Sequence, residues 1–127
     1  MEGIMITKLI SVLVFVTFFI SSTNAGSCDD PYTASPIITQ KLTGQKVQGK
    51  PQWQVTAQAP CSCCQIPVRL ACSGFQTVEP LDSNVITRDG DVCSYLNSIC
   101  PGHPTTFTYA WDQSYNFTVQ SFTTACS

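Results

Sequence analysis

Few side chains in this chain of 127 residues could carry out catalysis. The single histidine, His103, lies in the sequence PGHP, and no GxSxG-type motif supplies a nucleophile for it. Two carboxylate clusters, Asp29-Asp30 and Asp89-Gly90-Asp91, could serve a glycoside hydrolase, which needs a close acid pair. The second cluster is typical of a tight turn instead. We therefore predict that the protein is not an enzyme, and a small secreted hydrolase is the least favoured class.

The cysteines are the most numerous reactive side chains, and all eight follow residue 25. An even number in a small secreted chain predicts four disulfides. A bridge between the neighbours Cys63 and Cys64 would be strained, and the other pairings stay open. A metal site is disfavoured, because zinc sites usually combine two CxxC pairs or cysteines with paired histidines. The predicted disulfide cysteines are Cys28, Cys61, Cys63, Cys64, Cys72, Cys93, Cys100 and Cys126.

The N-terminus predicts the compartment in which these bridges form. Lys8 precedes the apolar run LISVLVFVTFFI, which ends at Ile20 and is too short for a membrane-spanning helix of roughly 20 residues. Thr23 and Ala25 occupy positions −3 and −1 of a signal cleavage site. We expect residues 1–25 to be a secretory signal. Residues 26–127 would then form one secreted cysteine-rich β domain, without membrane insertion after cleavage.

The composition excludes two further classes of function. Charged residues make up 11% of the chain, with six Lys plus Arg against eight Asp plus Glu and a net charge of −2. This balance excludes a basic nucleic-acid-binding surface and a polybasic membrane patch. Lys41, Lys46 and Lys50 are spaced through a loop-rich stretch, where they are either solvated or available to an acidic partner surface.

Apolar and polar residues alternate with a period of two over several short stretches, and this pattern predicts strands. Turn residues separate the stretches, and Pro67 predicts an edge strand or a bulge. Asp112-Gln113-Ser114 joins two aromatic-rich strands and predicts a hairpin. The predicted fold is a small disulfide-stabilised antiparallel β-sandwich, with a partly open barrel as the alternative. The predicted strands cover 51–60, 64–72, 105–112 and 115–122, with weaker ones at 35–42 and 85–87.

The aromatic residues leave a carbohydrate-binding module as an alternative function. Trp53, Trp111, Tyr109 and Tyr115 could form a platform on which sugars stack. Both tryptophans fall on the apolar faces of alternating strands, however, and this position favours packing in the core.

The sequon Asn116-Phe117-Thr118 predicts an N-glycan on Asn116. It lies within the predicted strand 115–122, where Asn116 falls on the polar face.

Several stretches of the chain resemble the tapetum-determinant-like family of small secreted plant cysteine-rich proteins. They are GKPQWQVTAQAPCSCC, LACSGFQTVEPLD, GDVC, FTYAWD and the final Cys126. The resemblance implies an extracellular signalling ligand in the apoplast. Such a ligand acts through the ectodomain of a leucine-rich-repeat receptor kinase in cell differentiation or reproductive development. The resemblance also implies no enzymatic activity and no cofactor.

The stretch GFQTVEPLD is the candidate receptor contact, since it reads as a loop and mixes Phe75 with Glu79 and Asp82. We expect replacement of Phe75 and Glu79 to weaken receptor binding without unfolding the domain.

Two cysteines depart from the family pattern. The recurring cysteines of the family match Cys28, Cys61, Cys63, Cys72, Cys93 and Cys126. Cys64 and Cys100 are additional, which leads to the hypothesis that they pair with each other.

Overall fold

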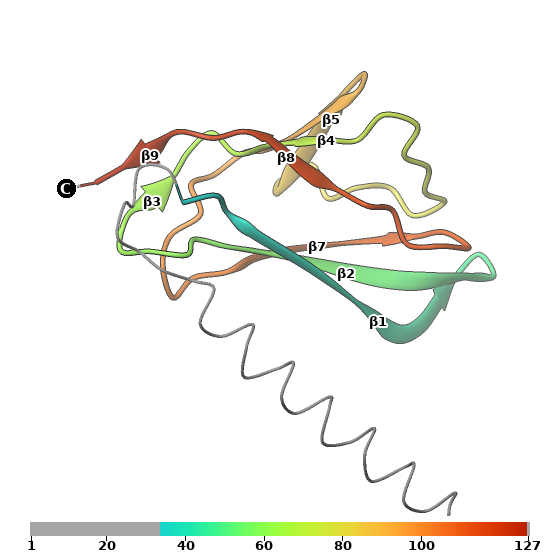
Figure 1. Cartoon of the computed structure of the whole chain (residues 1–127). Helices are drawn as coiled ribbons and strands as arrows, with labels where there is room; N and C mark the ends of the chain where they lie inside the picture. Colours follow the sequence, from blue (N-terminus) through green and yellow to red (C-terminus); the bar gives the residue numbers. More distant parts are fainter. Residues whose placement is uncertain (1–33, 127) are drawn as a thin grey trace, which may run out of the picture.

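The protein is built from two facing layers of β-strands (Figure 1). The structure is a computed structural model that describes residues 34–126, so the expected signal 1–25 and Cys28 lie outside the described residues. We call the sheet of order β1-β2-β7 the first sheet and the sheet of order β5-β6-β4-β8 the second sheet. The strands of the first sheet are β1 (Ile37–Val47), β2 (Lys50–Gln58) and β7 (Thr105–Ala110). The strands of the second sheet are β4 (Arg69–Ala71), β5 (Ile86–Asp89), β6 (Val92–Tyr95) and β8 (Thr118–Ser121).

A two-stranded sheet closes one end of the sandwich. It pairs β3 (Cys64–Gln65) with β9 (Thr124–Ala125), and every pairing between named strands is antiparallel. Residues 34–126 contain no helix, and the sheets do not close into a barrel. The predicted antiparallel β-sandwich is therefore confirmed, and the barrel alternative is wrong.

The predicted strands differ from the observed ones where contacts between distant segments determine the strand boundaries and the pairing. The run 64–72 is split into β3 and β4 on either side of Pro67, which follows a cis peptide bond. Strand β6 was not predicted. The hairpin predicted at residues 112–114 is wrong, because β7 belongs to the first sheet and β8 to the second. The segment between them crosses from one layer to the other, and it makes its hydrogen bonds outside a ladder.

The long β1–β2 hairpin turns at two residues. Val47 pairs with Lys50, and the residues between them, Gln48 and Gly49, have φ angles of 51° and 79°. Two positive φ values are the requirement of the type I′ turn, whose twist matches that of the flanking strands. Gly44, with φ of 89°, lies where the register shifts between Leu42 and Lys46. The tight turn and the register shift of this hairpin therefore each fall at a glycine with a positive φ angle.

The predicted alternation places the core between the two sheets. On β2, Val55 and Ala57 are fully buried, and on β7 Phe107 and Tyr109 face the same interior. From the second sheet, Leu70 and Tyr95 fill the opposite side. The rings of Tyr95 and Phe107 meet edge to face with centroids 5.9 Å apart, so the two layers are in direct contact.

Three disulfides within residues 34–126 connect the elements. Cys72–Cys93 joins the end of β4 to β6 inside the core, where both residues are fully buried. Cys63–Cys126 fastens the C-terminal strand, and Cys64–Cys100 fastens the loop before β7. Successive residues of an extended chain point in opposite directions, so the neighbours Cys63 and Cys64 reach different partners. The hypothesis that Cys64 pairs with Cys100 is confirmed, and Cys61 is also disulfide-bonded.

Removing this additional bridge should lower stability without changing the fold. We expect the double variant Cys64→Ala/Cys100→Ala to lose about 2–4 kcal/mol of unfolding free energy, because the bridge closes a long loop in the unfolded chain. Urea denaturation of the oxidised protein measures this loss. Ser62→Ala, a change at an exposed neighbour, is the control and should stay within about 0.5 kcal/mol of wild type. Equal stability of wild type and double variant would contradict the expectation.

Candidate interaction surface

We predicted from the sequence that residues 74–82 form a loop that contacts a receptor. In the structure these residues form the connection between β4 and β5, which we call the crossover. It runs beside the outer edge of β7, where the Val78 amide donates to the Ala110 carbonyl at 3.0 Å. In return, the Ala110 amide donates to Thr77 Oγ1 at 3.0 Å. The crossover therefore takes the place of a further strand at this edge, which explains why Ala110 is fully buried.

Phe75 lies in the core rather than on the surface. Only 2% of the residue is exposed, and its ring lies within 5.0–5.4 Å of the rings of Tyr109, Tyr115 and Phe117. Arg88 covers the remaining side, with its guanidinium carbon 5.7 Å from the ring centroid. The prediction that Phe75 is an accessible contact residue is wrong, because packing against β7 and the segment before β8 buries it.

Glu79 and Asp82 differ in how far they are available to a partner. The two carboxylate oxygens of Glu79 accept hydrogen bonds from Gln52 Nε2 at 3.1 Å and Thr108 Oγ1 at 2.7 Å. Glu79 thus holds the crossover against the outer face of the first sheet. Asp82 is exposed, and its Oδ1 accepts the Asn84 amide at 3.0 Å. Of the three predicted contact residues, Phe75, Glu79 and Asp82, only Asp82 presents its side chain mainly to solvent.

Truncating Phe75 should destabilise the whole domain. We expect Phe75→Ala to lower the unfolding free energy by about 3–5 kcal/mol, because it removes a buried ring and leaves a cavity among three aromatic neighbours. Urea denaturation measures the change. Asp82→Asn, which keeps the acceptor for the Asn84 amide, should change stability by less than about 0.5 kcal/mol. A Phe75→Ala protein as stable as Asp82→Asn would show that the ring is not part of the core.

A buried polar link holds the segment before β8 against β1. The Tyr109 hydroxyl donates to Gln40 Oε1 at 2.6 Å and accepts the Tyr115 amide at 2.8 Å. Gln40 Nε2 donates to the Tyr115 carbonyl. Burial raises the pKa of Tyr109, while the hydrogen bond from Tyr115 acts in the opposite direction. The protonated hydroxyl therefore stays a donor, and this link closes the sandwich between β1 and β8.

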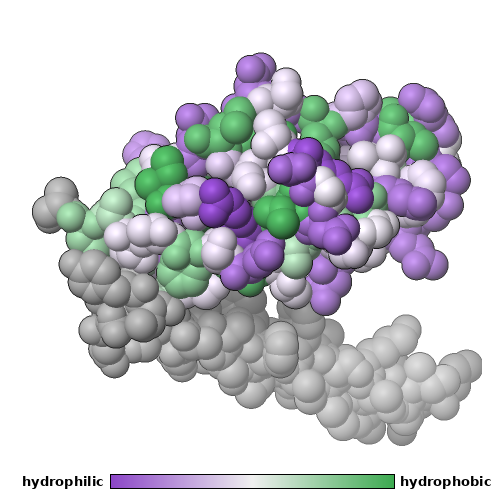
Figure 2. All heavy atoms as spheres, turned by 90° about the horizontal axis from the view of Figure 1, so that it is seen from above, coloured by the Kyte–Doolittle hydropathy of each residue, from purple (hydrophilic) through white to green (hydrophobic). Residues whose placement is uncertain are grey.

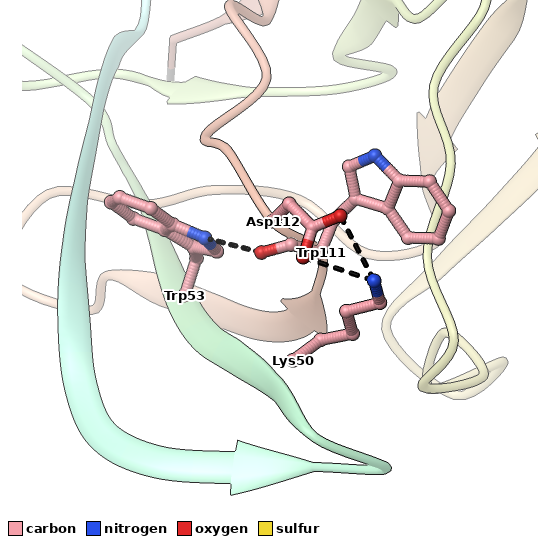
Figure 3. Close-up of polar contacts among 4 residues, drawn as sticks. All are labelled: Lys50, Trp53, Trp111 and Asp112. Atoms are coloured by element: carbon pink, nitrogen blue, oxygen red, sulfur yellow. Dashed lines mark hydrogen bonds and ion pairs between the residues drawn. The ribbon is translucent and has the colours of Figure 1, made fainter.

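The middle of β1 carries an exposed leucine. Leu42 is 56% exposed, the largest value among the exposed large hydrophobic residues of 34–126, and it lies opposite the half-buried Trp53. Trp53 Nε1 donates to the Trp111 carbonyl at 3.2 Å (Figure 3). The predicted core position of both tryptophans is partly right, because each packs against the core and keeps part of its surface accessible.

Three lysines lie on the β1–β2 hairpin, and an acid pairs with one of them. Lys50 Nζ lies 2.9 Å from Asp112 Oδ2 and 5.3 Å from the centroid of the Trp111 ring, so it is held by an ion pair and a cation–π contact (Figure 3). This ion pair is the only one within residues 34–126. Lys41 and Lys46 are exposed and have no counter-ion in the described part of the chain. Lys41 and the exposed Leu42 point to opposite faces of β1, because successive residues of a strand alternate in direction.

The described residues contain no arrangement suited to catalysis by a metal. Nowhere in 34–126 do three or more His, Cys, Asp or Glu residues gather in a way that could hold an ion. His103 is exposed, and its backbone amide donates to the Cys100 carbonyl at 3.0 Å. The same residues include no helix that is long and apolar enough to cross a membrane.

Asn116 lies outside the strands, contrary to the prediction that it sits within one. It precedes β8 and is exposed, as is Thr118. Its neighbours are fixed: the Tyr115 hydroxyl donates to the Ser73 carbonyl at 2.7 Å, and Phe117 is buried among aromatic rings. The asparagine side chain is therefore held at the surface by an anchored residue on each side.

Secreted protein should carry an N-glycan on Asn116, because both the acceptor side chain and the hydroxyl of the sequon are accessible. Intact mass before and after enzymatic removal of N-glycans measures occupancy. Thr118→Ser retains the sequon and should keep the mass difference, whereas Thr118→Ala should abolish it. A wild-type protein whose mass does not change on treatment would contradict the expectation.

The geometry defines the class of the molecule as a small disulfide-stabilised all-β sandwich. Comparison with known proteins identifies the family. The family model described as "Tapetum determinant 1, C-terminal" matches residues 33–126, so the chain belongs to this family of plant reproductive-development signalling proteins. The resemblance found in the sequence is thereby confirmed. No curated protein and no solved structure matches the chain.

Proposed function

We propose that the protein is a secreted extracellular ligand that binds the ectodomain of a leucine-rich-repeat receptor kinase. The observation that carries the proposal is the family match, which spans all of the described residues 34–126. Two further features support secretion. Disulfides form and persist in oxidising compartments, and residues 1–25 have the pattern of a secretory signal.

The architecture is suited to binding as a rigid body. The disulfides and the aromatic core fix both layers, so little conformational entropy remains to be lost when a partner binds. A leucine-rich-repeat ectodomain offers an extended concave face that accommodates a small compact domain. Surface complementarity, with an apolar anchor inside a polar rim, would provide the affinity.

The alternative, a cell-wall carbohydrate-binding module, has weaker support. Such a module requires two or three aromatic side chains that are coplanar and exposed on one face. Every aromatic side chain within residues 34–126 is buried or half-buried. Tyr109 and Tyr115 of the expected platform form part of the interior cluster around Phe75. The structure therefore favours the ligand over the carbohydrate-binding module.

The ligand proposal predicts saturable binding to one or a few receptor ectodomains. The oxidised protein, purified from a plant secretion host, is tested by biolayer interferometry against a panel of leucine-rich-repeat receptor kinase ectodomains. Binding should disappear after reduction, because the bridges hold the binding surface in place. The panel members must bind their own known ligands in the same assay. Absence of binding across such a panel, together with retention on insoluble polysaccharide, would favour the carbohydrate-binding module instead.

A further inference from the structure

We propose that the protein forms a homodimer in which the β1 strands of two copies pair antiparallel, edge to edge, about a two-fold axis. The contact segment is residues 37–42, over which β1 pairs with β2 without interruption. The inference concerns the assembly of the domain and does not depend on the ligand role, so each can fail without the other. A dimeric ligand would present two copies of its receptor-binding surface.

Strand β1 is the longest open edge in the described part of the chain. The first sheet has the order β1-β2-β7, and the crossover covers the outer edge of β7, where the Val78 amide donates to the Ala110 carbonyl. The edge strands of the second sheet, β5 and β8, have 4 residues each, whereas β1 has 11. No backbone hydrogen bond joins the outer side of β1 to another segment of residues 34–126. Such an edge is a template for pairing with another chain.

The hydrogen bonds of β2 determine which backbone groups of β1 point outward. In an antiparallel ladder the N–H and C=O groups of one residue point to one neighbouring strand, and those of the next residue point the other way. The Pro51 carbonyl accepts the Trp111 amide on the β7 side, so the even-numbered residues of β2 point to β1. In the contact segment these residues pair with the odd-numbered residues of β1. The N–H and C=O groups of Ile38, Gln40 and Leu42 therefore point away from the sheet.

A two-fold axis at Gln40 pairs these three residues with their counterparts in a second copy. Gln40 then lies opposite the second Gln40, and Ile38 opposite the second Leu42, and each pair exchanges two backbone hydrogen bonds. Paired residues share a face of the sheet, so Ile38, which packs against the core, would cover the exposed Leu42. On the other face Thr39 would lie opposite Lys41, and no two lysines would face each other directly. This is the one symmetric register that pairs all three outward-pointing residues.

A second copy fits this edge better than the proposed receptor does. A leucine-rich-repeat ectodomain is a stack of repeats in which each repeat contacts its neighbours, so the strands of its concave face already have partners on both sides. Pairing of two β1 strands would join the two first sheets into one, whose remaining edges are β7 edges covered by crossovers. The assembly would therefore close at two copies. The second sheet offers no comparable contact, because hydrophobic residues are scattered among hydrophilic ones on its outer side (Figure 2).

The features of β1 that discourage pairing limit the contact and do not prevent it. Lysines and irregularities on an edge strand act against association with other chains. The register shift lies between Leu42 and Lys46, and it ends the contact segment. Lys41 lies within the segment, and its two copies would be diagonal neighbours, about 7–8 Å apart. We expect a weak dimer, with a dissociation constant on the order of micromolar, because a single pair of strands buries less area than a standard interface.

Two substitutions of the exposed Thr39 test the register. Thr39→Lys would place like charges opposite each other at Lys41 on both sides of the axis, whereas Thr39→Glu would place opposite charges there. We expect Thr39→Lys to weaken the dimer about fivefold and Thr39→Glu to strengthen it by a similar factor. Sedimentation equilibrium of the oxidised protein, at concentrations from about 1 to about 300 μM, measures the association.

A pair of proline variants tests the edge itself. Leu42→Pro removes an outward N–H that makes no bond to β2, and it should abolish the dimer. Lys46→Pro, on the same strand beyond the register shift, is the matched control and should dimerise like wild type. Unchanged thermal unfolding shows that each variant is folded.

Three results would overturn the inference. They are a wild type that stays monomeric at every concentration, a Leu42→Pro protein that dimerises like Lys46→Pro, and equal association of Thr39→Lys and Thr39→Glu. Binding to the receptor panel is measured separately. A monomeric wild type that binds an ectodomain would therefore overturn the dimer and leave the ligand role intact, and a dimer that binds no ectodomain would do the reverse.

Discussion

Burial of the Phe75 ring is the interaction on which the arrangement of this protein depends. The ring comes from the crossover between β4 and β5, and it packs against Tyr109 of β7 and against Tyr115 and Phe117, which lead into β8. The crossover, β7 and the segment that leads into β8 therefore meet at the Phe75 side chain. β7 belongs to the first sheet, and the other two segments lead into strands of the second sheet. The crossover is thereby held along β7, where it satisfies the backbone of Ala110.

The polar contacts around this cluster follow from the same packing. Once Tyr109 is fixed in the interior, its hydroxyl needs a partner, and Gln40 and the Tyr115 amide supply acceptor and donor. Glu79 is brought over the outer face of the first sheet, where Gln52 and Thr108 occupy its carboxylate. The crossover presents few free polar groups to a partner, because Glu79 and Thr77 are hydrogen-bonded within the domain and only Asp82 points mainly to solvent.

The disulfides stabilise different parts of the sandwich. Cys72–Cys93 is an interior bridge that complements the packing of the second sheet. Cys63 and Cys64 instead hold the C-terminal strand and the loop before β7, so adjacent residues fasten two distant segments at one place. A domain of this size buries a limited fraction of its surface, and covalent links reduce the number of conformations open to the unfolded chain. The hairpin at the other end has no such link and relies on its turn and on the Lys50–Asp112 and Trp53–Trp111 contacts.

The sequence by itself determined the fold class and the family, and the departure from the family's cysteine pattern led to the hypothesis, which the structure confirms, that Cys64 pairs with Cys100. These conclusions depend on local patterns. A period of two along a strand indicates which face is buried, as at Val55 and Ala57. A family motif can be recognised from the order of its residues alone. Only the tertiary structure decided that Phe75 is interior, that Glu79 is bonded, and that residues 111–117 cross between sheets. A loop has no period, so its burial depends on which distant strand it meets. For the same reason the accessible surface of Leu42 could be recognised only after β1 was placed at the edge of its sheet.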